Sequence, residues 1–82
     1  MDALTSNVYS FEGTLAGAPV AITFNLRVRK FIVTNDSTLN NMTVTLVGTD
    51  LTLKPTETLT ATVSLLKLTI NGTGGYRVWG FA

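Results

Sequence analysis

The chain has 82 residues, which gives room for one hydrophobic core and therefore for one domain. It contains no cysteine and no histidine, and this excludes disulfides, thiolate chemistry, zinc fingers and the commonest metal ligand. The net charge of +1 provides no general attraction to nucleic acid or to anionic lipid. Small domains without disulfides or metals usually gain stability from a partner chain, so we expect a homo-oligomer, either a dimer or a trimer.

Charged residues make up only 13% of the chain, against a usual share of about 25%. Fifteen threonines supply much of the polar surface in their place. No run of about 18 apolar residues is present to cross a membrane, and residues 1–10 lack the basic and apolar regions of a secretory signal. We therefore expect a complete protein made in the cytoplasm, with neither membrane nor nucleic acid among its partners.

The apolar residues recur with a period of two along almost the whole chain, and threonine, valine, isoleucine and aromatic residues dominate. This pattern predicts β-strands and no helix. In chain order the predicted strands cover residues 7–15, 20–35 with a break or bulge near Arg29 and Lys30, 42–48, 51–53, 59–64, 66–70 and 76–81. Residues 1–6 are predicted to be a flexible N-terminal arm, so that the single domain covers residues 7–82.

Seven to eight short strands with frequent turn signals predict an all-β fold, an antiparallel β-sandwich or a small jelly-roll-like barrel. The predicted connections are residues 16–19, 35–41, 54–58 and 71–75. The last of these, with the sequence NGTGG, matches neither the Walker nor the dinucleotide spacing of glycines and is predicted to close a hairpin. Alternation also assigns two sets of residues to shared faces: Ile22, Phe24, Leu26 and Val28, and Leu66, Leu68 and Ile70.

The residues that enzymes use for acid and base chemistry are few and scattered. The carboxylates occur singly: Asp2, Glu12, Asp36, Asp50 and Glu57. A serine nucleophile would find no histidine to act as its base. The polar segment 34–41 contains a single carboxylate, which is too few for a tight calcium site. The sequence therefore predicts a protein that is not an enzyme and that holds neither a cofactor nor a metal.

The only basic run is RVRK, residues 27–30, and alternation places Arg27 and Arg29 on one face of a strand. Three interpretations are open for this run. It is an ordinary solvated strand, it supplies contacts at the rim of an interface with an acidic protein, or it binds nucleic acid.

The final strand, residues 76–81, carries large apolar groups on both faces. Arg77, Trp79 and Phe81 share one face, and Tyr76, Val78 and Gly80 share the other. One face is expected to join the core. The other is covered by a loop, contacts another chain, or binds sugar through Trp79 and Tyr76. Because tryptophan, tyrosine and arginine are enriched at binding hot spots, this strand is the candidate interaction site.

The order of the motifs FIVTNDS, MTVTLVG, LTLKPTETLTATV and LKLTINGTGGYRVWGFA, which span residues 31–82, resembles small β-sandwich proteins of tailed-bacteriophage virions, of the capsid decoration or cement type. In such proteins a polar Asn-Asp turn precedes a Leu-x-Pro-x-Glu turn, and an aromatic residue and an arginine lie near the end. Thr56 departs from the pattern, because glycine is common at that place in the turn. The resemblance implies a structural role in the virion and no catalytic residues.

We therefore expect a non-enzymatic virion protein that binds a phage capsid and bridges and stabilises its shell subunits. The expected partner is the major capsid protein or another virion protein. The expected interface residues are Arg77, Trp79, Phe81 and Tyr76, with Arg27 and Arg29 at the rim. The alternative is a carbohydrate- or receptor-binding β-module of a phage tail or head fibre. A small nucleic-acid-binding barrel is a more distant third interpretation.

Overall fold

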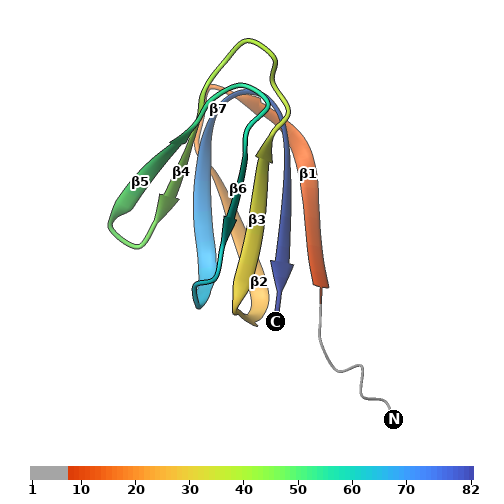
Figure 1. Cartoon of the computed structure of the whole chain (residues 1–82), viewed down its shortest axis with the longest axis vertical. Helices are drawn as coiled ribbons and strands as arrows, with labels where there is room; N and C mark the ends of the chain where they lie inside the picture. The colour runs from red at the N-terminus through yellow and green to blue at the C-terminus, as the bar shows by residue number, and fades with distance from the viewer. Residues whose placement is uncertain (1–7) are drawn as a thin grey trace.

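A computed structural model describes residues 8–82, so the predicted arm at residues 1–6 lies outside the described residues. The described part of the chain forms seven strands and no helix (Figure 1). The strands are β1 (Val8–Ala16), β2 (Val20–Val28), β3 (Lys30–Asn35), β4 (Met42–Leu46), β5 (Thr49–Leu53), β6 (Thr58–Ala61) and β7 (Leu65–Phe81). This confirms the predicted all-β fold.

The last strand, β7, organises the molecule, because four of the other strands pair with it. Its first half pairs with β2 and β4, and its second half pairs with β1 and β3, always in the antiparallel direction. β5 extends the sheet beyond β4, and β6 extends it beyond β3. The sheet is therefore curled into two layers: the first contains β1, the second half of β7, β3 and β6, and the second contains β2, the first half of β7, β4 and β5 (Figure 1).

β7 passes from one layer to the other through an arch at residues 71–75 (Figure 1). The prediction of a hairpin here is wrong, because the two halves of β7 pair with different strands and not with each other. Gly74 lies inside the arch with φ of 115°, and a Cβ atom there would lie 2.7 Å from Cβ of Ser37. Only glycine fits this backbone conformation and this space without strain. The glycine-rich segment thus serves to bend a continuous strand across the top of the sandwich.

The predicted break near Arg29 is confirmed, since β2 ends at Val28 and β3 begins at Lys30. Two predictions about faces are wrong. Leu26 is 51% exposed, because the pairing of β2 with β7 changes register between Thr23 and Val28. Leu66 is 42% exposed while its neighbour Leu65 is buried, so the alternation is interrupted at the start of β7 as well.

The core lies between the two layers and draws apolar side chains from both. Fully buried members include Phe31, Val33 and Val78 from the first layer and Phe24, Met42, Val44 and Ile70 from the second. The rings of Tyr9 and Phe11 pack against Phe24, with centroid distances of 6.0 and 5.7 Å. Burying a side chain of this size contributes about 1.5–3 kcal/mol, so this interlayer packing holds the curled sheet closed.

The loop that follows β3 is fixed by the buried side chain of Asn35. Its amide nitrogen donates to the backbone oxygens of Asn40, Leu53 and Lys54, and its oxygen accepts from the backbone N–H of Ser37. The Ser37 hydroxyl in turn accepts from two backbone N–H groups further along the loop. A loop tied down in this way holds the side chain of Asp36 at a defined position beside the first layer.

The turn between β5 and β6 has the arrangement of a type II turn. The backbone N–H of Glu57 donates to the carbonyl of Lys54, Pro55 takes the second position, and Thr56 takes the third with φ of 66°. The third position of this turn requires a positive φ, which is why glycine is preferred there. Thr56 therefore occupies a backbone conformation that is unfavourable for a β-branched residue.

Candidate functional site

The second half of β7 divides its side chains between the core and the outside. Val78 and Gly80 are buried, and Tyr76 packs against the core on the same side. Arg77 points outward and is exposed, while Trp79 and Phe81 on the same outward side are half-buried. The outward side of the first layer therefore carries two aromatic rings.

The strand register shows which side chains surround these rings, because directly paired residues share a face. Trp79 lies between Ser10 of β1 and Ile32 of β3. The neighbouring rows of the same face are Glu12, Arg77 and Thr34 on one side, and Val8, Phe81 and Lys30 on the other. We call this surface, made of Val8, Glu12, Lys30, Ile32, Arg77, Trp79 and Phe81, the outer aromatic face.

Each ring of the outer aromatic face has a cation above it. The guanidinium carbon of Arg77 lies 5.4 Å from the centroid of Trp79, and the Nζ atom of Lys30 lies 5.5 Å from the centroid of Phe81. Both distances are within the range of cation–π attraction. The face thus combines apolar area with positive charge held at fixed positions.

Arg77 is also joined to the loop after β3. Its Nε atom donates to Oδ2 of Asp36 at 2.8 Å, and its Nη2 atom donates to Oδ1 at 2.9 Å. These hydrogen bonds, together with the charge of Asp36, raise the pKa of Arg77 above its usual value. The bidentate pair fixes the plane of the guanidinium, which in turn fixes its place over Trp79.

A hollow of about 400 Å³ adjoins the outer aromatic face where β7 ends. It is lined by Arg29, Lys30, Thr62, Phe81 and Ala82. Arg29 is held at this place because its backbone N–H donates to the carbonyl of Phe81 at 2.8 Å. Two cations beside an aromatic ring form a place where an acidic side chain of a partner would be stabilised.

The outward face of the second layer has a different character. Its threonines pair across the strands, Thr45 with Thr69 and Thr43 with Thr52, and no aromatic residue of the described chain lies on it. A polar outward side of this kind is normal for an antiparallel sheet that has one side in water. The outer aromatic face departs from that norm, and this contrast marks it as the candidate site.

The structure brings together most of the residues that the sequence singled out. Arg77, Trp79 and Phe81 share the outer aromatic face, and Arg29 lines the adjoining hollow. Tyr76 lies on the core-facing side of β7 with its ring over Gly13 of β1. Arg27 is exposed on β2, in the second layer.

Four members of the face were not proposed as interface residues from the sequence: Val8, Glu12, Lys30 and Ile32. The alternation of Lys30 and Ile32 with the buried Phe31 and Val33 already indicates that these two side chains point outward. Their place next to Phe81 and Trp79 depends on the pairing register of β3 with β7. A single sequence contains no signal for that register.

Within residues 8–82, no group of three or more acidic side chains is placed to hold a metal ion, and no helix is long and apolar enough to cross a membrane. Comparisons with models of protein families, with curated proteins and with solved structures give no match for this chain.

Proposed function

We propose that this chain is a non-enzymatic structural protein that attaches through its outer aromatic face to the protein shell of a phage, as a decoration protein. The observation that carries the proposal is the row of Trp79 beside Ile32, with Phe81 in the next row and a cation over each ring. Aromatic residues and arginine are the types enriched at the centres of protein interfaces.

The charge of the face defines the kind of surface that it would bind. Lys30 and Arg29 lie beside Phe81 at the hollow, whereas the guanidinium of Arg77 already has Asp36 as its partner. The partner surface is therefore apolar at its centre and carries at least one carboxylate opposite Lys30 and Arg29. Such charge complementarity contributes to orientation and to the rate of association.

The geometry favours a protein partner over the sugar of the alternative hypothesis. Tyr76 and Trp79 lie on opposite sides of β7, so they do not form one stacking platform. Arg77 also lies over the Trp79 ring, where a sugar would need a free ring face. A protein surface contacts the edges of the rings and their apolar neighbours without this competition.

The virion as the location follows from the resemblance of residues 31–82 to small β-sandwich proteins of tailed phages. On a shell, one small interface is repeated over many equivalent sites. Apolar burial contributes about 25 cal/mol per Å² at each site, so many copies stabilise the shell together even where a single copy binds weakly.

The proposal is tested by sedimentation of the purified chain with empty shells of the phage whose genome encodes it. Saturable co-sedimentation that persists in the presence of a mixture of competing glycans supports it. Binding on a glycan array without co-sedimentation with shells would show that the carbohydrate-binding alternative is correct.

A further inference from the structure

The described part of the chain has a second apolar surface, outside the outer aromatic face. Six large apolar side chains of residues 8–82 are exposed. Two of them lie in two connections at one end of the sandwich, and a third lies at the start of β7. They are Val47, which is 91% exposed, in the β4–β5 turn, and Val63 and Leu66, which are 41% and 42% exposed, around the β6–β7 connection.

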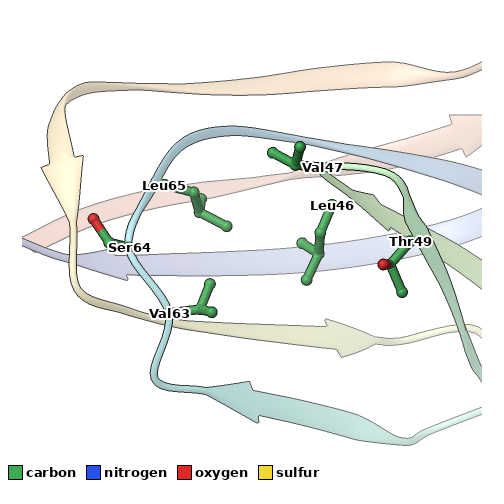
Figure 2. A pocket seen from close by; sticks show the side chains of 6 residues that line it. All are labelled: Leu46, Val47, Thr49, Val63, Ser64 and Leu65. Carbon is green, nitrogen blue, oxygen red and sulfur yellow. The ribbon is translucent and has the colours of Figure 1, made fainter.

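These two connections enclose a hollow of about 280 Å³, which we call the end hollow. It is lined by Leu46, Val47, Thr49, Val63, Ser64 and Leu65. Figure 2 shows the side chains of Leu46, Val63 and Leu65 turned toward one another, with Val47 at the rim and the hydroxyl of Ser64 directed away. The apolar part of the lining comes from Leu46 and Leu65 of the second layer and from the two connections, through Val47 and Val63.

The end hollow differs from the outer aromatic face in its charge. None of its six lining residues is ionisable, whereas Arg29 and Lys30 line the hollow beside Phe81. A contact between two copies of one surface about a two-fold axis brings equivalent groups close together. An uncharged surface therefore associates with itself without like-charge repulsion, and it matches the depletion of charged residues at the centres of protein interfaces.

The shape of this end also fits self-association. Val47 projects from the rim of the end hollow, and the hollow is large enough to receive a valine side chain. The projecting side chain and the hollow that could hold its equivalent from another copy therefore lie on one patch. A two-fold axis beside Val47 would place each Val47 in the hollow of the other copy.

From these observations we infer that the end hollow is the interface between two copies of this chain, related by a two-fold axis that passes beside Val47. The inference goes beyond the proposed function and does not depend on it. It leaves the outer aromatic face of each copy free, so a dimer would present two such faces and could join two neighbouring sites on a repetitive surface.

Sedimentation velocity over a range of concentrations tests the inference. We expect wild-type protein to sediment as a dimer that dissociates on dilution, and Val47→Ser or Val63→Ser to weaken the association at least tenfold. The matched control is Val8→Ser, which changes an exposed valine of the outer aromatic face and should leave the association unchanged. Wild-type protein that is monomeric at every concentration would overturn the inference. A dimer that is weakened by Val8→Ser but not by Val47→Ser would overturn it as well.

Because the chain contains no cysteine, a single introduced thiol gives an independent readout. Val47→Cys should form a disulfide-linked dimer under mild oxidation, since two copies of residue 47 lie close to the axis. Thr23→Cys, on the exposed face of the second layer, should stay monomeric on a non-reducing gel. Equal yields from the two variants would contradict the proposed axis. Loss of shell binding with the dimer intact would instead count against the proposed function alone.

Discussion

Arg77 makes two parallel hydrogen bonds with Asp36, and the same guanidinium lies over the ring of Trp79. The two partners of Arg77 come from different parts of the chain: Asp36 from the loop after β3, and Trp79 from β7 itself. This relationship orients the outer aromatic face before any partner binds. Side chains that are already ordered lose less conformational entropy on binding.

Removing Asp36 should loosen the face without unfolding the protein. We expect Asp36→Ala to change the melting temperature little, because Arg77 is solvent-exposed and screening weakens the ion pair. The freed guanidinium would leave the Trp79 ring, so quenching of the single tryptophan by iodide should increase. Asp50→Ala is the matched control, since Asp50 accepts a hydrogen bond from the neighbouring Thr45 and should leave quenching unchanged.

The positive charge of Lys30 should contribute to recognition of the shell. Lys30→Glu places a negative charge beside Phe81 and should weaken co-sedimentation with shells about tenfold or more, since like charges across an interface are repelled. Lys67→Glu makes the same change on the outward face of the second layer and should have little effect. Equal losses for the two variants would indicate a general charge effect in place of a defined face.

Thr56→Gly should stabilise the protein. Thr56 has a φ of 66°, a conformation that glycine adopts without strain. The relief of backbone strain should exceed the cost of the greater conformational entropy of the unfolded chain. We expect the free energy of unfolding to rise by about 0.5–1 kcal/mol, which corresponds to roughly 2–8 °C in melting temperature. Thr52→Gly, in the middle of β5, is the control and should lower the melting temperature. A destabilised Thr56→Gly protein would show that the side chain of Thr56 contributes more than its backbone strain costs.

Gly74→Ala should disrupt the arch between the layers. The new Cβ atom would meet Ser37 in a backbone conformation that already disfavours alanine, with an expected cost of about 2–4 kcal/mol in the free energy of unfolding. Gly48→Ala is a matched control, because Gly48 has φ of 73° but no atom near its missing Cβ, so only about 1 kcal/mol should be lost. Urea denaturation of both variants measures the difference, and equal losses would exclude a steric role for Ser37.

The sequence predicts the strands well because the period of two depends only on local alternation. The outward set of Arg77, Trp79 and Phe81 follows from the same alternation once one side of the strand is buried. The arch at residues 71–75 could not be predicted, because asparagine and glycines suit a hairpin and a bent strand equally, and only the distant partners β1, β2, β3 and β4 distinguish the two.

The neighbours of Trp79 on the outer aromatic face could not be predicted from the sequence either. Ile32 lies 47 residues away in the chain, and its pairing with Trp79 depends on the register of two strands. Simple alternation places Leu26 and Leu66 on the same faces as Phe24 and Leu68, but the register of β2 with β7 changes in this region, and both side chains are exposed. Such irregularities follow from the fit between the two layers and not from the local residue pattern.

The most direct test of the outer aromatic face is the affinity of Trp79→Ala for empty shells, compared with that of Leu26→Ala. Leu26 is an exposed leucine of the second layer, so its removal controls for loss of apolar surface in general. With both variants shown to be folded by their circular dichroism, we predict that Trp79→Ala binds at least about thirtyfold more weakly, as expected for a hot-spot residue. Leu26→Ala should bind as the wild type does. Undiminished binding of folded Trp79→Ala would contradict the assignment of this face to shell attachment.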